Sequence, residues 1–389
     1  MWSRAVLAGL TVLVAGCASA PPARDAGRVS PPELLAARPL AAAAPTETAA
    51  PVDETEVLAV SPEMRAFVAE HVARGATRPM KLLQLTSALI DVPGFRLTYD
   101  ETTRTAAATF KARRGNCLSF SNMFVALARQ AGLQAWFQEV DAPPDWSFRD
   151  DAFVLNRHIN VLVDLGRAGE RVVDFNVDDF KASYDRRVIT DERALAHYYN
   201  NVAVERLRAG DGASALACLR KALAHDTEFS PAWTTLGTLY RRGGQGGHAE
   251  GAYLRALDAD GADTVAMSNL SWLYEHEGDA GRAAWYRHRV LAHRNRNPYY
   301  HFQLGKEAFD KGEYDAAIAH VERAARTKRN EDQFYFLLSL AYRQKGDTRT
   351  AARYLARAQR VAATDELRRR YESKMQALGQ RPKDAVQPQ

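Results

Sequence analysis

Residues 230–244 read Ser-Pro-Ala-Trp-Thr-Thr-Leu-Gly-Thr-Leu-Tyr-Arg-Arg-Gly-Gly, and the pattern of this stretch recurs throughout the second half of the chain. Three series of positions repeat at a step of 34 residues. The glycine series is Gly210, Gly244, Gly278, Gly312 and Gly346. The alanine series is Ala215, Ala249, Ala283, Ala317 and Ala351, and the small-residue series is Ala203, Gly237, Ser271, Gly305 and Ser339. A fixed period of this kind is typical of a protein that stacks copies of one structural unit.

Each copy is predicted to be a pair of helices. The small residues let the two helices approach closely, and the glycine ends the first helix in a left-handed conformation that a β-carbon would penalise. The motif Trp233-x2-Leu236-Gly237-x2-Tyr240 resembles the first helix of the tetratricopeptide repeat. We therefore expect an all-α solenoid of five repeats over residues 196–365, followed by a capping helix and tail over 366–389.

The resemblance implies that a protein or peptide binds in the concave groove of the repeats, although the fold alone does not name a ligand. One repeat position carries a large side chain in every copy, and we expect packing between helices there: Tyr199, Trp233, Met267, His301 and Tyr335. The sequence leaves the oligomeric state open.

Composition places the chain among ordinary globular proteins. It has 389 residues, of which 46% are hydrophobic and 25% charged, so a mainly disordered or collagen-like chain is excluded. The length predicts two or three folded units. The net charge of +5 is small for this size, which argues against nucleic-acid binding.

The first residues are predicted to be a lipoprotein signal peptide over 1–16. Val14-Ala15-Gly16-Cys17 ends a short apolar run and resembles a bacterial lipobox, which implies cleavage before Cys17 and lipid attachment to it. The alternative is an ordinary cleavage site after Ala18-Ser19-Ala20. Residues 17–55 are rich in alanine and proline and are expected to be a tether. The predicted location is the cell envelope, on the periplasmic face of the outer membrane.

Residues 56–195 lack the repeat and contain the candidate chemistry. Phe120, Met123, Phe124 and Leu127 recur at helical spacing, which predicts a helix with one buried face. Asn116 is a plausible N-cap for it and places Cys117 in the first turn. Free backbone N–H groups and the helix dipole favour a thiolate there.

Two predicted strands supply partners for the thiol. His158 and Asn160 lie on one face of the strand 158–163, and Asp174 and Asn176 lie on one face of the strand 171–177. If the strands form a hairpin with 158 or 160 opposite 174, His158 and Asp174 share a face, whereas a slip of one residue separates them.

These motifs, in this order, resemble the transglutaminase-like superfamily, which has a papain-like α+β fold. The resemblance implies a catalytic triad of Cys117 as nucleophile, His158 as base and Asp174 as orienting acid. Asn116 is a guess for the oxyanion donor, Trp136 and Trp146 are candidate cleft residues, and Asp178 and Asp179 are rivals of Asp174. The histidine is followed by Ile-Asn where many members have Ala-Trp.

The expected function is that of a lipid-anchored cysteine enzyme acting on amide bonds, as a peptidase or amidase or by transglutaminase-type acyl transfer. The competing interpretation is a non-enzymatic adaptor with a degenerate domain. We expect no cofactor and no metal, because residues 56–195 contain no paired Cys or His at ligand spacing. Cys218 is expected to be a packing residue.

Overall fold

The computed structural model describes residues 29–37, 51–90, 95, 97–140, 146–149, 152–155, 158–175, 185–362 and 364–379; for 146–149, 152–155 and 377–379 it describes the backbone. Cys17, Asp178 and Asp179 lie outside these ranges, as does the predicted signal peptide. None of the helices within the ranges has the length and apolar character needed to cross a membrane.

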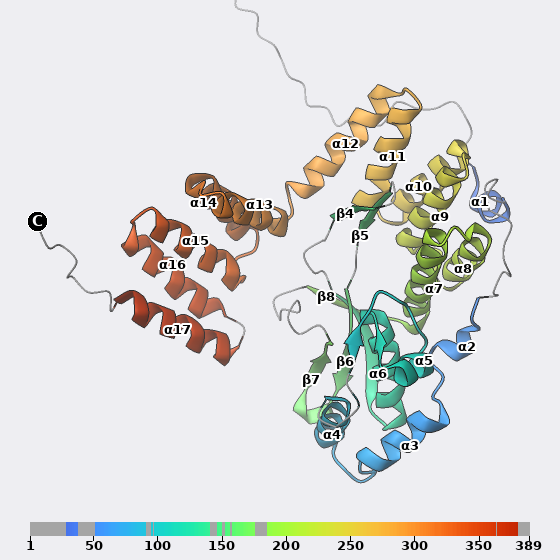
Figure 1. Cartoon of the computed structure of the whole chain (residues 1–389), viewed down its shortest axis with the longest axis horizontal. Coiled ribbons are helices and arrows are strands. Elements are labelled where there is room, and N and C mark those ends of the chain that lie inside the picture. The colour runs from blue at the N-terminus through green and yellow to red at the C-terminus, as the bar shows by residue number, and fades with distance from the viewer. Residues whose placement is uncertain are drawn as a thin grey trace, which may run out of the picture.

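A four-stranded antiparallel sheet forms the centre of the first domain (Figure 1). Its strand order is β7-β6-β3-β8, and the strands are β3 (Gln134–Val140), β6 (His158–Asp164), β7 (Glu170–Val173) and β8 (Arg186–Ile189). The helices around it are α3 (Pro62–His71), α4 (Arg78–Ile90), α5 (Ala106–Ala112) and α6 (Cys117–Gln130), with a 3-10 turn at Gly166–Ala168. Two small pairs complete the domain: the parallel strands β1 (Thr98–Tyr99) and β2 (Arg114–Gly115), and the hairpin β4 (Trp146–Arg149) and β5 (Ala152–Leu155).

Helix α6 packs against β3 and β6, as the apolar spacing predicts. Its face of Phe120, Met123, Phe124 and Leu127 is buried. Alternate residues of β6, among them Val161, are buried in the same core. Helix and sheet therefore bury their apolar faces against each other, which fixes where the first turn of α6 lies.

The repeat region consists of paired helices, as the 34-residue period predicts. The first helices of the pairs are α7 (Asp191–Arg208), α9 (Ser230–Arg242), α11 (Thr264–His276), α13 (Pro298–Asp310) and α15 (Asp332–Gln344). The second helices are α8 (Gly212–His225), α10 (Gly246–Ala259), α12 (Ala280–Arg294), α14 (Tyr314–Thr327) and α16 (Thr348–Val361), and α17 (Asp365–Gly379) packs on the last pair.

The glycine series, the large-residue position and the small residue Gly237 have the structural roles that the repeat pattern predicts. All five glycines of the 34-residue series have a left-handed φ, between 72° and 83°. The five large residues, Tyr199, Trp233, Met267, His301 and Tyr335, are all buried, which confirms their packing role. A β-carbon on Gly237 would lie 2.5 Å from the Tyr253 ring, so the small residue is needed for helix contact.

The array has two hydrophobic cores. The first includes the sheet domain and helices α7 to α12, and the second includes α14 to α17 with aromatic residues of α13. Successive pairs elsewhere stack closely, as α10 does on α11 and α14 on α15, but α12 and α13 share no comparable packing (Figure 1). Repeats four and five with α17 thus form a separate module.

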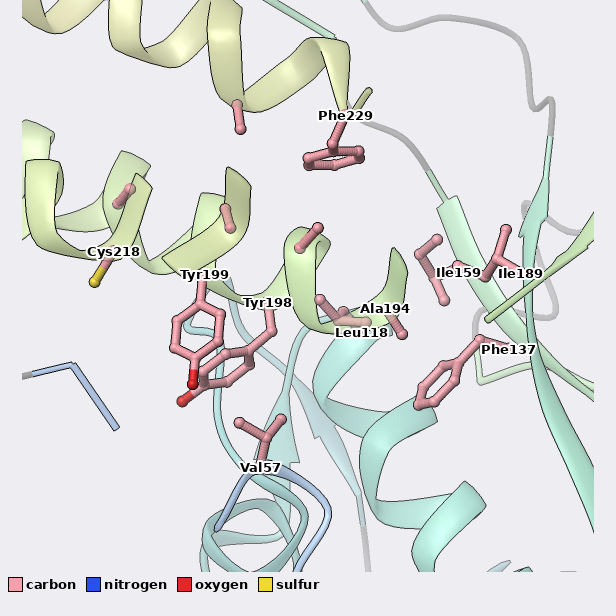
Figure 2. Packing of buried hydrophobic residues seen from close by; sticks show 14 of the residues in the cluster. Val57, Leu118, Phe137, Ile159, Ile189, Ala194, Tyr198, Tyr199, Cys218 and Phe229 are labelled. Carbon is pink, nitrogen blue, oxygen red and sulfur yellow. The ribbon is translucent and has the colours of Figure 1, made fainter. Parts of the chain in front are cut away.

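The sheet domain and the first repeat share one core (Figure 2). Leu118 and Phe137 of the sheet domain lie in the same buried cluster as Ala194 and Tyr198 of α7 (Figure 2). Helix α7 begins at Asp191, before the expected repeat boundary at 196, so this one helix belongs to both units.

A polar cluster around Glu139 also joins these two units. Its buried carboxylate bonds to Arg187 on β8 at 2.5 Å and to Arg193 and His197 on α7 at 3.1 and 2.8 Å. Burial alone would raise the pKa of Glu139, but the hydrogen bond and charge of His197 and the two arginines hold it well below its usual range. The carboxylate therefore stays ionised between strand and helix.

Within the predicted tether of residues 17–55, the structure describes two short helices. Residues 31–36 form helix α1 (Pro31–Ala36), capped by Ser30 and Glu33, and Leu34 is fully buried against α10. Residues 54–57 form α2 (Glu54–Val57), where Val57 joins the main core. The alanine and proline content of residues 17–55 gave no indication of these two short helices.

Candidate active site

The first turn of α6 is built by a tight strand-to-helix connection. Asn116 caps the helix by accepting a hydrogen bond from the Ser119 backbone N–H at 2.9 Å, which confirms its predicted capping role. A β-carbon on Gly115 would lie 2.6 Å from that of Ser119, so only glycine fits there. Cys117 is the first helical residue, and its N–H is one of those that an α-helix leaves unpaired.

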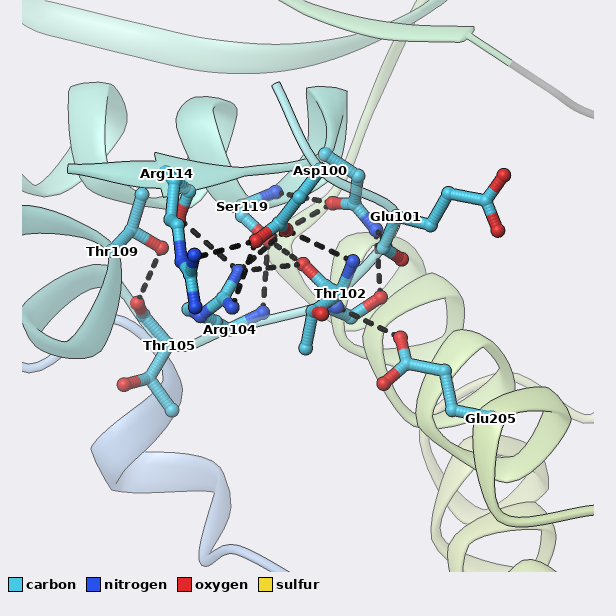
Figure 3. A network of polar contacts seen from close by, with 11 residues as sticks. Asp100, Glu101, Thr102, Arg104, Thr105, Thr109, Arg114, Ser119 and Glu205 are labelled. Carbon is cyan, nitrogen blue, oxygen red and sulfur yellow. Dashed lines mark hydrogen bonds and ion pairs between the residues drawn. The ribbon is translucent and has the colours of Figure 1, made fainter. Parts of the chain in front are cut away.

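A hydrogen-bond network fixes the loop before this helix (Figure 3). Asp100 binds the Arg104 guanidinium through both oxygens, at 2.6 and 2.9 Å, and Arg114 lies 3.3 Å from the same carboxylate. The hydrogen bond from Arg104 holds the pKa of Asp100 below its usual range. Ser119 Oγ donates to the Thr102 carbonyl at 3.2 Å, so loop and helix hold each other in place.

Two strands bring His158 and Asp174 together. Val161 lies opposite Val173, which continues to place Asn160 opposite Asp174, the even-sum register required by the sequence argument. His158 Nε2 lies 2.6 Å from Asp174 Oδ2, and the carboxylate accepts this hydrogen bond. The Asp174 side chain is 4% exposed and that of His158 17%, so the pair is nearly closed to water.

Cys117 lies near enough to the His158 ring to affect the charge of that ring. Because Nε2 is bound to Asp174, Nδ1 is the ring nitrogen left for the thiol. Burial alone would lower the pKa of His158, but the hydrogen bonds and charges of Asp174 and Cys117 outweigh it and raise this pKa to about 10. The ring is therefore protonated at neutral pH.

Contacts between α6 and the strands keep these groups in register. Ser121 Oγ donates to the Ile159 carbonyl at 3.2 Å, next to His158. Phe175 follows Asp174 in the chain. The centre of its ring lies 5.1 Å from that of Phe120 and 5.9 Å from that of Phe124. The helix thus holds both strands that carry the acid and the base.

Asn160 is a member of the site that the sequence argument left without a role. Its amide Nδ2 donates to Asp174 Oδ2 at 2.9 Å, and the residue is 1% exposed. Two hydrogen bonds therefore meet at one carboxylate oxygen. The signal was present in the sequence, since Asn160 lies two residues after His158 on the same strand face and departs from the family's usual tryptophan.

Of the other predicted residues, Asn116 adjoins Cys117 and Trp136 lies farther along β3. The Asn116 side-chain amide donates to Thr103 Oγ1 at 2.8 Å while its oxygen caps the helix, and its oxyanion role stays a prediction. Trp136 is 36% exposed on β3 opposite Leu162, four residues from Val140, which lies opposite His158. At about 3.4 Å per residue it is ~14 Å along the strand from the histidine. Trp146 begins β4, and its side chain lies outside the described part.

The second described cysteine is remote from this chemistry. Cys218 is 2% exposed in the first repeat, and burial raises the pKa of its thiol to about 11. Both Cys117 and Cys218 are free thiols. Within the described ranges, no three His, Cys, Asp or Glu side chains are grouped as metal ligands.

Comparison with protein families identifies both parts of the chain. Residues 66–154 match the transglutaminase-like superfamily, and residues 298–331 and 332–365 each match the tetratricopeptide repeat. The first match contains Cys117 and ends before His158. The helix pairs of α7 to α12 lie outside the second match and share its 34-residue glycine series.

Several solved structures are similar to part of this chain. A crystal structure of MamA protein is 22% identical over 46% of this chain and 96% of that chain, with a TM-score of 0.24. YrrB, described as a TPR protein with an unusual peptide-binding site, is 19% identical over 46% and 92%, also at 0.24. PilF of Pseudomonas aeruginosa is 16% identical over 49% and 91%, at 0.26. A comparison with curated proteins gives no match.

Proposed function

From a transglutaminase-like domain followed by a helical tetratricopeptide-repeat region, we propose a cysteine enzyme that acts on amide bonds while its repeats recruit a protein partner. The observation that carries this proposal is the hydrogen bond between His158 and Asp174, on a ring whose charge also responds to Cys117. The three side chains come from the start of a helix, from a strand and from the residue after a second strand, and they are the groups that nucleophilic catalysis by cysteine requires.

The chemistry follows from the ion pair. The Cys117 thiolate attacks the amide carbonyl carbon, the carbon–nitrogen bond breaks, and His158 gives its proton to the departing amine. The product is a thioester on Cys117 with a neutral imidazole beside it. Water then attacks the thioester, His158 takes the proton, and the sulfur leaves as a thiolate, which releases a carboxylic acid and restores the ion pair.

Water is the acceptor we favour, because it is always present and none of the described side chains of the site marks an amine-binding position. An amine acceptor would instead give a cross-link by the same acyl-enzyme. We also propose that Cys17 carries a lipid that attaches the protein to the cell envelope at the periplasmic face of the outer membrane, as its lipobox-like sequence suggests.

Alkylation by iodoacetamide tests the nucleophile directly. At pH 6 the wild-type protein should react at Cys117 at least about tenfold faster than a model thiol, because a free thiol of pKa near 8.5 is almost fully protonated there. The ratio of the Cys117 rate to the model-thiol rate should fall as the pH rises and the model thiol ionises. The His158 imidazolium, which we propose activates Cys117, loses its proton only as the pH rises through about 10. Mass spectrometry of the labelled peptide measures both rates.

His158→Ala should remove the advantage, and Cys218→Ser, which changes a buried thiol far from the site, should leave it intact. A Cys117 that reacts no faster than the model thiol between pH 6 and 8, with no effect of His158→Ala, would leave the adaptor interpretation in place of the enzyme.

A further inference from the structure

The two halves of the repeat array present different inner faces. The first helices of successive pairs pack beside one another, as α7 does with α9 and α13 with α15, so they line one side of the array. On such a helix the positions i, i+4 and i+7 share a face. In the C-terminal module we define the C-terminal groove face as six side chains at these positions of α13, α15 and α17: Phe302, Lys306, Phe309, Arg343, Arg370 and Lys374.

The corresponding face of the N-terminal repeats is more buried. At the equivalent positions Asn200, Thr234, Thr238 and Ser268 are buried, Arg241 and Trp272 are half-buried, and Glu275 is exposed. The protein's own sheet domain covers this side, because β3 contacts α7 and β5 lies beside α11 (Figure 1). A partner that enters the inner side of the array therefore meets an open surface in the C-terminal module.

The C-terminal groove face is open and strongly basic. Its four cations are exposed and its two phenylalanines are half-buried. Two exposed acids, Asp310 and Glu366, lie four residues along the helices from Lys306 and Arg370, so cations outnumber acids on this side of the module. As far as the described residues extend, none of the four cations has a carboxylate at ion-pair distance, whereas Arg193 and Arg282 of the earlier repeats are both paired. Uncompensated cations of like sign favour the binding of an anion.

Aromatic rings lie between these cations. Lys374 Nζ stands 3.9 Å from the centre of the Phe336 ring, one repeat after Phe302. The Phe302 ring packs 5.0 Å from Phe334 along one edge, which leaves it a half-exposed apolar surface. The face thus alternates positive charge with apolar area instead of presenting charge alone.

We propose that the C-terminal groove face binds an extended, acidic peptide segment that also carries an aromatic or large apolar side chain. The carboxylates would pair with Lys306, Arg343, Arg370 and Lys374, and the apolar side chain would cover the exposed edge of a phenylalanine. This inference rests on the recruiting role in the proposed function and names its partner class. We favour a peptide over a flat anionic surface such as a membrane. A flat surface would contact the exposed arginines of α16, whereas a narrow peptide can enter the groove.

Fluorescence anisotropy with the full chain tests the proposal. The probes are labelled peptides of about twelve residues that contain Asp, Glu and two Phe, with one version in which Lys replaces every acid and one in which Ser replaces both Phe. The acidic aromatic peptide should bind tightest. Lys306→Glu with Arg343→Glu should weaken it at least about tenfold, since two attractive contacts become repulsive.

The matched control is Arg349→Glu with Arg353→Glu, which makes the same change of net charge on exposed residues of α16. It should alter the affinity less than about twofold. Equal losses in both double variants, or equal binding of the acidic and basic peptides, would overturn the proposal. So would binding of anionic phosphatidylglycerol vesicles, lost in the groove variant, by a protein that binds none of the peptides.

Cys117 alkylation in the same variants separates this inference from the enzyme proposal. The groove variants should react with iodoacetamide like the wild type, because the second core is separate from the one that holds the site. Peptide binding without an activated Cys117 would support the docking surface on an adaptor, and an activated Cys117 without peptide binding would overturn the docking surface alone.

Discussion

At the scale of single residues, the site depends on where a few polar side chains are forced to point. The Asp174 carboxylate is buried, so protein groups and not water have to supply its hydrogen bonds while it faces His158. Asn160 supplies one of them from the neighbouring strand. The residue that departs from the family pattern is therefore also the one that orients the acid.

Asn160→Ala should slow catalysis by about 10- to 100-fold through loss of positioning, the range found when an orienting partner of a catalytic group is removed. The effect should fall mainly on kcat, and the rate of Cys117 alkylation at pH 6 should fall with it. Steady-state kinetics and the alkylation pH profile measure these changes.

Asn160→Ser, which keeps a donor, should recover part of the loss. If Asn160→Ala lowered thermal stability but left the alkylation profile of Cys117 unchanged, Asn160 would be a packing residue and not a positioning one.

At the scale of elements, helix α7 joins the sheet domain to the repeat array. It begins the first repeat, and through Arg193 and His197 it also binds Glu139 on the central strand β3. Glu139 lies opposite Ile159, the residue between His158 and Asn160. The strand that borders the candidate site is thus held from its other side by the repeat array.

Glu139→Gln should destabilise the protein by about 3 kcal/mol, because it removes the charge of the buried carboxylate that Arg187, Arg193 and His197 share, while Arg193 keeps its second partner Asp226. The sign of the pH dependence follows from the lowered pKa of Glu139: its stabilisation is present above about pH 4.5, the unfolded value, and is lost as the pH falls toward the lower folded pKa. Urea unfolding between pH 3 and 7 measures the difference, which should shrink at the acidic end.

Glu228→Gln is the matched control, because Glu228 pairs with Arg255 on the surface, where such pairs contribute at most about 1 kcal/mol. A Glu139 variant no less stable than the Glu228 variant would show that the cluster around Glu139 does not join the two units.

At the scale of the whole molecule, the N-terminal segment is docked along the repeats. Leu34 is buried against α10, and Arg220 Nε donates to the Leu35 carbonyl at 2.7 Å. Eleven residues, 18–28, connect Cys17 to the docked segment in the sequence. A chain of this length can reach at most ~37 Å, so a lipid on Cys17 would keep the repeats close to the membrane.

Cys17→Ser should abolish metabolic labelling by a fatty-acid analogue and move the protein from the membrane to the aqueous fraction of the cell envelope, because acyl chains are the proposed anchor. Cys218→Ser should retain both the label and the membrane location. A Cys17→Ser protein that remains in the membrane fraction would contradict lipid anchoring and favour another attachment.

Local and periodic features of the fold could be predicted from the sequence. The 34-residue step predicts the helix pairs and their left-handed glycines, and the spacing from Phe120 to Leu127 predicts α6 with its cap at Asn116, since these features depend on neighbours along the chain. Tertiary structure decided what depends on distant residues. It placed Asn160 against Asp174, moved Trp136 along β3 away from His158, docked Leu34 on α10 and divided the array after α12. Such contacts depend on strand register and on packing between elements. Residues far apart in sequence can fill the same buried surface, and a local sequence pattern does not show which of them does so.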